Sequence, residues 1–222
     1  MNKFRPYLDP RISLNQRLNI TLTELAIATK IQKSLDAFLD LLIVKDMFTY
    51  EHSVRVALLD RLIAQFIGLN ERALFFAGAL HDIGKIQTRL ELLQKTAGWT
   101  QADREEMKQH VMIGHELLCE CFSFSAEIII WHHRFQTQCY PETLPPLLHQ
   151  YSDITEDTIP RCGRVLALAD SYDAAHRINE NFGNDQPLTG ALIKEKMIAS
   201  NADQSELVKM LYDANIFTEE LF

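Results

Sequence analysis

Apolar residues recur at intervals of three and four along most of this chain, and no segment alternates apolar and polar residues with the period of a β-strand. The pattern predicts an all-α protein. We expect helices over residues 24–44, 50–67, 71–83, 126–135, 161–178, 191–199 and 205–214, a further helix from residue 101, and a proline-containing loop over residues 136–160. Because 47% of the 222 residues are hydrophobic, the chain can bury a core without disulfide bonds.

Capping residues indicate where these helices begin and end. The predicted N-caps are Thr21, Asn70, Thr100 and Ser125, and the predicted C-terminal stops are Gly68 and Gly84. With these ends, His52 lies in the first turn of its helix, whereas His81 and Asp82 lie in the last turn of theirs.

The charge balance restricts what the chain can bind. Asp and Glu total 30 against 22 Lys and Arg, a net charge of −8 without a concentrated basic stretch. We therefore expect no DNA or RNA partner, whereas an anionic small molecule could bind beside a divalent metal ion. No apolar segment is long enough to span a bilayer and no signal sequence is recognisable, so we expect a cytoplasmic protein without membrane contact. The four cysteines lack zinc-finger spacing and are expected to be reduced.

Ionisable residues interrupt two otherwise apolar stretches. The first, AGALHDIGKI (77–86), contains His81, Asp82 and Lys85, and the second, VLALADSY (165–172), contains Asp170. An unpaired carboxylate on an apolar helical face costs several kcal/mol unless a cation or hydrogen-bond donors accompany it. Imidazole and carboxylate together form a site suited to iron, manganese or zinc, so these stretches indicate a metal site.

Several separated blocks of the sequence resemble the HD superfamily of metal-dependent phosphohydrolases, in particular its HD-GYP branch. The resemblance covers about residues 48–175. In order, the blocks are EHSVRVA, LHDIGK, LQKTAGWTQADREEMKQH, HVMIGHELL, WHH, YPETL and IPRCGRVLALADSYDA. The resemblance implies an HD-domain helical bundle with a two-metal site between helices.

Carried onto the matching positions, the resemblance implies a complete set of metal ligands. The core ligands would be His52, His81, Asp82 and Asp170, with Asp82 bridging two ions. The ligands added in the HD-GYP branch would be His110, His132 and His133. Lys85 matches the family lysine that meets a substrate phosphate, so Asp82 and Lys85 are the expected catalytic residues.

The sequence departs from the family pattern at three places. Phe48 stands where a glutamate of the family can hold a third ion, so we expect two divalent ions. Iron or manganese is favoured as the metal, before zinc, nickel, cobalt or magnesium. The loop after the histidine doublet keeps Tyr140 but has Cys139 in place of the glycine of the Gly-Tyr-Pro motif. Of a downstream arginine-containing segment that grips the cyclic dinucleotide, only Arg177 remains. We expect Tyr140, Arg177 and Lys85 to bind substrate.

We predict a metal-dependent phosphodiesterase that hydrolyses a cyclic dinucleotide, with cyclic di-GMP favoured on the resemblance alone. The alternatives are an HD phosphohydrolase acting on another nucleotide or a phosphomonoester, and an inactive signalling module that binds a nucleotide or a protein. Residues 1–45 are expected to form a helical extension packed on the domain of residues 46–222. Because the amphipathic stretch 24–44 suits either a core or a dimer face, a homodimer or a signalling partner stays an open alternative.

Some residues also have a purely structural interpretation. Lys85 could offset the negative end of its helix. Asp173, three residues after Asp170, is expected to accept a hydrogen bond and not to bind a metal ion. The histidines expected on the surface are His115, His149 and His176.

Overall fold

The computed structural model describes residues 12–136, 138–177 and 188–218. The all-α prediction is confirmed, since these ranges contain helices and loops but no strand. The elements are α1 (Leu14–Glu24), α2 (Thr29–Lys45), α3 (Met47–Ile67), α4 (Glu71–Leu80), the 3-10 helix η1 (Ile83–Gln87), α5 (Leu90–Leu93), α6 (Gln101–Leu118), α7 (Ser123–Ile129), α8 (Asp153–Ala175), α9 (Gly190–Ser200), the 3-10 helix η2 (Ala202–Gln204) and α10 (Ser205–Asp213).

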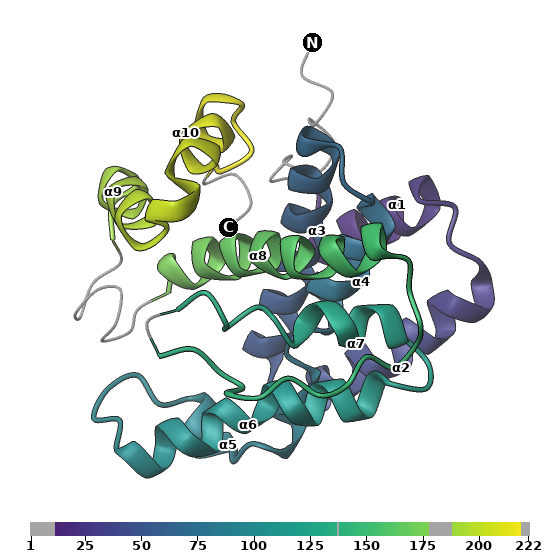
Figure 1. Ribbon diagram of the computed structural model, residues 1–222. Coiled ribbons are helices and arrows are strands. Elements are labelled where there is room, and N and C mark those ends of the chain that lie inside the picture. The colour runs from purple at the N-terminus through teal and green to yellow at the C-terminus, as the bar shows by residue number, and fades with distance from the viewer. Residues whose placement is uncertain (1–11, 137, 178–187, 219–222) are drawn as a thin grey trace.

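Helix α3 is the central element of the bundle. It packs against α1, α2, α4 and α8, and α8 crosses the middle of the molecule in Figure 1. Val54, Leu58 and Leu62 follow one another at four-residue intervals and are all buried. Burial of each such leucine contributes about 1.5–3 kcal/mol. The helix ends at Gly68, whose left-handed conformation (φ +74°) is the predicted stop.

The prediction of one helix over residues 24–44 is wrong. A turn at residues 25–28 separates α1 from α2, and Thr21 is buried within α1 instead of capping a helix. The true cap is Ser13, whose hydroxyl accepts from the amide of Gln16 while the Gln16 side chain accepts from the amide of Ser13. Leu25 and Ile27 in the turn are buried too, so the apolar pattern runs through the break.

The end of α4 also differs from the prediction, because the helix stops at Leu80. His81 is its C-cap, and Asp82 leads into η1, which contains Gly84. Gly84 is therefore not the helix stop. Its lack of a side chain permits a close approach instead, since a Cβ there would lie 1.9 Å from the carbonyl oxygen of His110 on α6. The turn thus brings His81 and Asp82 against α6.

Two boundaries around α7 were predicted incorrectly. Ser125 lies inside α7 and not at its cap, and residues 130–135 form turns instead of continuing the helix. The turn begins where α7 meets α8 closely, since a Cβ on Gly163 would lie 2.3 Å from Cβ of Trp131. The histidine doublet is therefore placed by a turn and not by a helix.

Helix α8 begins within the segment predicted as a loop. The hydroxyl of Ser152 accepts from the amide of Thr155, and acidic residues occupy the first turn, where the helix dipole favours them. Pro160 lies inside the helix. The capping pattern thus outweighs the proline. Of the predicted helix 161–178, Ile178 lies outside the described residues.

The predicted C-terminal helices are present as α9 and α10, which pack against each other at the upper left of Figure 1. Helix α9 also packs against α8. Within the described ranges, no helix combines the length and the apolar character that crossing a membrane requires.

Candidate metal centre

Side chains from five segments converge in the interior. His52 comes from α3, His81 and Asp82 follow α4, His110 comes from α6, the doublet His132 and His133 follows α7, and Asp170 comes from α8. Each belongs to a group of three side chains whose potential ligand atoms lie within 4.8 Å of one another. The fold therefore brings together all seven residues that the sequence predicts as ligands.

His52, His81 and Asp170 form the first group. Nε2 of His52 lies 3.2 Å from Nε2 of His81 and 3.2 Å from Oδ1 of Asp170. Nδ1 of His81 donates to the carbonyl of Gly78 at 2.8 Å, and Nδ1 of His52 donates to Oδ2 of Asp173 at 2.7 Å. In these tautomers both Nε2 atoms are acceptors that face a carboxylate oxygen. Such an arrangement requires positive charge between the atoms.

His110, His132 and His133 form the second group. Nδ1 of His110 donates to the carbonyl of Met107, and Nδ1 of His132 donates to the carbonyl of Ile129. Both Nε2 atoms, together with Nδ1 of His133, are buried and have no hydrogen-bond partner among the described residues. Buried nitrogens without partners are uncommon in proteins and often mark a binding function.

Asp82 lies between the two groups. Its Oδ1 is 3.5 Å from Nε2 of His110, whereas its Oδ2 is 3.4 Å from Nε2 of His81 and 3.5 Å from Nε2 of His52. The same Oδ2 accepts from Nζ of Lys85 at 2.5 Å. One carboxylate oxygen therefore faces each group.

Burial disfavours the charged form of four of the imidazoles. It lowers the pKa of His81 to about 4 and that of His110 to about 3, and it also lowers the pKa of His132 and His133. Neutral imidazole is the form that binds metal ions.

The two carboxylates behave in the opposite way. Burial alone would raise the pKa of Asp82, but the charge that the neighbouring imidazoles carry when protonated, His81 first, and the ammonium of Lys85 hold it well below its usual range. For Asp170 burial is likewise outweighed, first by its interaction with His52, and the pKa lies well below its usual range. The site thus offers neutral nitrogens and anionic oxygens, a donor set that fits divalent metal ions.

A pair of residues outside the ligand groups orients His52. Asp173 accepts from His52, as expected, and also from Nε of Arg55 at 2.6 Å. Arg55 Nη2 adds a bond to the second Asp173 oxygen at 3.2 Å. The sequence analysis missed Arg55, although its position three residues after His52 on α3 places both on one helix face.

The predicted substrate residues lie around this centre. The ring of Tyr140 stacks on His133, with centroids 4.4 Å apart and planes at 22°. Arg134 donates to the carbonyl oxygen of Glu142 at 2.9 Å and so holds the loop that carries Tyr140. Arg177 donates to Asp173 at 3.3 Å, and its side chain is 38% exposed. Lys85 is in direct contact with Asp82.

The surface prediction for His115 is wrong. Its side chain is buried because it shares the inner face of α6 with Val111 and Leu118. His149 is exposed, and His176 is half-buried with its ring edge-on to Tyr172 at 4.7 Å.

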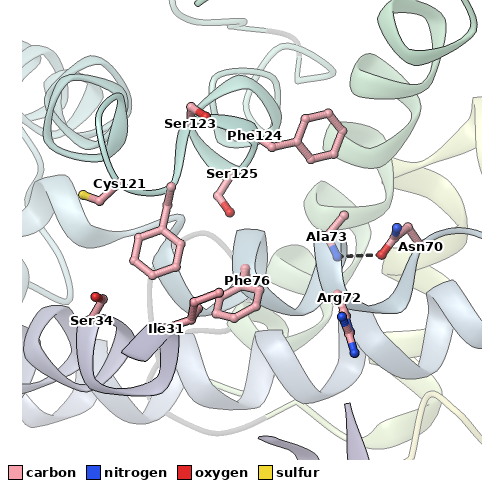
Figure 2. Close-up of a pocket in the computed structure, with 11 residues that line it drawn as sticks. Ile31, Ser34, Asn70, Arg72, Ala73, Phe76, Cys121, Ser123, Phe124 and Ser125 are labelled. Carbon is pink, nitrogen blue, oxygen red and sulfur yellow. Dashed lines mark hydrogen bonds between the residues drawn. The ribbon is translucent and has the colours of Figure 1, made fainter. Parts of the chain in front are cut away.

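A cavity of about 420 Å³ lies elsewhere, between α2, α4 and α7 (Figure 2). Its wall includes Ile31, Phe76 and Phe124, and the dashed line marks the predicted cap of α4, in which Asn70 accepts from the amide of Ala73 at 3.0 Å. None of the metal-binding groups found in the described residues lines it. The centre described above is therefore the candidate site.

Comparison with known proteins identifies the class. The model of the HD domain family matches residues 49–175, and the chain therefore belongs to this family. Its sequence is 33% identical over 173 residues to a cyclic di-GMP phosphodiesterase of Thermotoga maritima, and 29% identical over 171 residues to the cyclic di-GMP phosphodiesterase response regulator RpfG of Xanthomonas campestris. These alignments cover 74% and 73% of this chain but 44% and 42% of the relatives, so the chain spans less than half of their length.

Two further known proteins match this chain, one over a shorter stretch and the other at lower sequence identity. A 3'3'-cGAMP-specific phosphodiesterase of Vibrio cholerae is 28% identical over 142 residues, which cover 59% of this chain and 29% of that protein. The solved structure of the HD domain of the L. monocytogenes phosphodiesterase PgpH matches 83% of this chain and 94% of its own, with a TM-score of 0.56 and 22% identity. This structure supports the fold assignment, and the resemblance found in the sequence is confirmed.

Proposed function

We propose that this chain carries a metal-dependent phosphodiesterase activity on a cyclic dinucleotide, with cyclic di-GMP as the favoured substrate. The observation that carries the proposal is the pair of buried ligand groups, in which His52 and His81 face each other through acceptor nitrogens 3.2 Å apart. The printed activities of the Thermotoga and Xanthomonas relatives favour cyclic di-GMP.

In this proposal the centre holds two divalent ions, with iron or manganese favoured. His52, His81 and Asp170 would hold one ion, His110, His132 and His133 the other, and Asp82 would bridge them. The carboxylate of Asp82, which has one oxygen toward each group, supports a bridging role. When bound, such ions would activate water for attack on phosphorus and neutralise charge on the phosphoryl oxygens.

The remaining roles belong to residues beside the ligands. Backbone carbonyls and Asp173 hold the Nδ1 protons, so the imidazoles keep one orientation throughout the reaction. Lys85 supplies a positive point charge for a substrate phosphate, and its contact with Asp82 keeps it at the centre. Burial raises the pKa of Tyr140 well above its usual range, so its hydroxyl stays protonated and can donate to substrate. Arg177 would add a contact at the rim.

A second cyclic dinucleotide is a specific alternative. Relatives in Vibrio cholerae are named as specific for 3'3'-cGAMP, and this chain has Cys139 before Tyr140 and Pro141, so the loop beside the centre departs from the Gly-Tyr-Pro pattern. The proposed substrate class accommodates both molecules, and direct competition distinguishes them.

The test combines elemental analysis with a product assay. We expect about two transition-metal ions per chain, and in the presence of manganese we expect conversion of cyclic di-GMP, compared with 3'3'-cGAMP, cyclic di-AMP and nucleoside monophosphates. Hydrolysis restricted to monophosphates would establish a different phosphohydrolase. Bound metal without turnover of any phosphodiester would establish a binding module.

The two-part organisation stays a proposal as well. Helices α1 and α2 pack on α3, which agrees with an extension of residues 1–45 on a domain of residues 46–222. A cytoplasmic location and a homodimer or signalling partner remain predictions of the sequence.

A further inference from the structure

A second cavity, of about 240 Å³, adjoins the candidate metal centre. Its lining includes Trp99, Arg104, Met107, Lys108 and Tyr140. Tyr140 belongs to both places, since its ring also stacks on His133. Met107 belongs to both as well, because its carbonyl accepts from His110. The cavity and the ligand groups therefore share one wall.

Helix α6 determines which side chains face this cavity. Arg104, Met107 and Lys108 stand at positions i, i+3 and i+4 and so lie on one helix face. Lys108 pairs with the exposed Glu105 at 2.9 Å, and such an exposed pair contributes little. Among the described residues that line the cavity, two are cations and none is an acid, although the whole chain has a net charge of −8. The charged residues in the lining therefore favour an anion.

Trp99 is fixed at the edge of the cavity by the cap of α6. Asp103 accepts from the amide of Thr100 at 3.0 Å, from its hydroxyl at 2.8 Å and from Nζ of Lys95 at 2.7 Å. These bonds hold the segment on both sides of Trp99 against the first turn of α6. The half-buried indole is thus a preformed surface that costs little entropy to use.

We infer that this cavity binds a nucleobase of the substrate, which stacks on Trp99, while Lys108 and Arg104 contact the phosphate that is not being cleaved. An indole beside two cations matches the chemistry of a nucleotide, because every base has a face for stacking and its phosphate is anionic. The inference rests on the proposed function. It adds three substrate-binding residues on α6 and its cap to those expected from the sequence.

The test uses the metal-loaded protein and two substrates. Trp99→Leu should raise KM for cyclic di-GMP roughly 5- to 150-fold, the range expected for loss of one stacked base, with little change in kcat. Trp99→Phe should retain most of the affinity. Methyl 4-nitrophenyl phosphate has no base to reach the cavity, so its kcat/KM should be the same in all variants. An unchanged KM for cyclic di-GMP in Trp99→Leu would overturn the inference.

Lys108→Met tests the phosphate contact, and the chain offers a matched control. Lys209 on α10 also pairs with a glutamate three residues earlier, at 2.6 Å, but does not line the cavity. Lys108→Met should raise KM for cyclic di-GMP and weaken its dependence on salt, whereas Lys209→Met should change neither. Equal effects of the two substitutions would contradict a specific contact.

A binding measurement separates this inference from the proposed function. Calorimetry with a hydrolysis-resistant phosphorothioate analogue of cyclic di-GMP reports binding without turnover. If the wild-type protein cleaves no diester but binds the analogue and Trp99→Leu binds it at least fivefold more weakly, the cavity assignment stands and the activity fails. If the protein cleaves cyclic di-GMP and both proteins bind equally, the activity stands and the cavity assignment fails. Absence of binding to either protein refutes the cavity assignment.

Discussion

Asp60 and Asp82 are both enclosed carboxylic acids, one within α3 and the other just after α4, but their surroundings are opposite. Neither oxygen of Asp60 has a hydrogen-bond partner among the described residues, whereas Asp82 is surrounded by imidazoles and Lys85. Burial therefore raises the pKa of Asp60 well above its usual range, with a smaller contribution from Asp170. The pKa of Asp82 is held well below its usual range.

The comparison shows that burial does not by itself mark a functional acid. Asp60 packs where Gly78 leaves space, since a Cβ on that glycine would lie 2.8 Å from Oδ2 of Asp60. Its surroundings favour the neutral form of the carboxyl group, which fills volume. Asp82 stays anionic because the ammonium of Lys85 contacts it, and an anionic oxygen is what a metal ion requires.

The largest expected effect is that of Asp82→Asn, which keeps the shape and removes the charge. It should abolish stoichiometric metal binding and lower the proposed phosphodiesterase activity by more than about 100-fold. About 100-fold is the largest loss typical of replacing a residue that hydrogen-bonds to a metal ligand, and Asp82 is itself a proposed ligand. Asp60→Asn is the matched control and should retain metal and activity. Elemental analysis and the product assay check both variants, and equal losses would remove the distinction between the two acids.

Next in size is Arg55→Met, which leaves Asp173 without its bidentate partner and loosens His52. We expect metal affinity to fall roughly 10- to 100-fold. Competition with a fluorescent chelator measures this affinity. Arg61→Met, on the same helix, breaks ion pairs with Glu24 and Glu71 instead and should leave metal affinity unchanged. A loss in the Arg61 variant alone would contradict the orienting role of Arg55.

A third prediction concerns the pH dependence of stability. Folding raises the pKa of Asp60 above its ordinary value of 3.8, so between the two pKa values the unfolded chain has lost a proton that the folded protein keeps. The stabilising contribution of Asp60 is full below pH 3.8 and is lost as pH rises through the folded pKa. Relative to wild type, Asp60→Asn should gain up to about 1.4 kcal/mol of unfolding free energy per pH unit between the unfolded and the folded pKa of Asp60.

Urea unfolding of both metal-free proteins at several pH values measures this difference. The histidines of the centre titrate in both proteins, so their effect cancels when the two curves are subtracted. Parallel curves would mean that Asp60 is ionised in the folded state, and the contrast with Asp82 would disappear.

The smallest effect is expected for an exposed ion pair, that of Glu206 with Lys209 on α10. Glu206→Gln should change the free energy of unfolding by no more than about 0.5 kcal/mol, because exposed pairs are screened by water and salt. Urea unfolding at neutral pH provides the value. A loss of more than about 2 kcal/mol would show that the exposure of an acidic residue does not determine how much it contributes to the free energy of unfolding.

The amino-acid sequence alone predicted the helical class, some of the helix ends and the identity of the ionisable residues that converge. Helical spacing and caps such as Asn70 and Thr100 act over a few residues, so they can be recognised without the fold. The turn at residues 25–28, which separates α1 from α2, was missed because the apolar spacing continues through it. The start of α8 after its cap Ser152 was missed because the prolines dominated the local pattern.

Which atoms of these residues face one another depends on how the helices pack. The pairing of Asp173 with Arg55, the burial of His115 and the contrast between Asp60 and Asp82 depend on contacts between segments far apart in the chain. The cavity beside Trp99 likewise needs α6 and the loop of Tyr140 to meet. Protonation and tautomer follow from the partners and solvent around a group, and these exist only once the helices are packed.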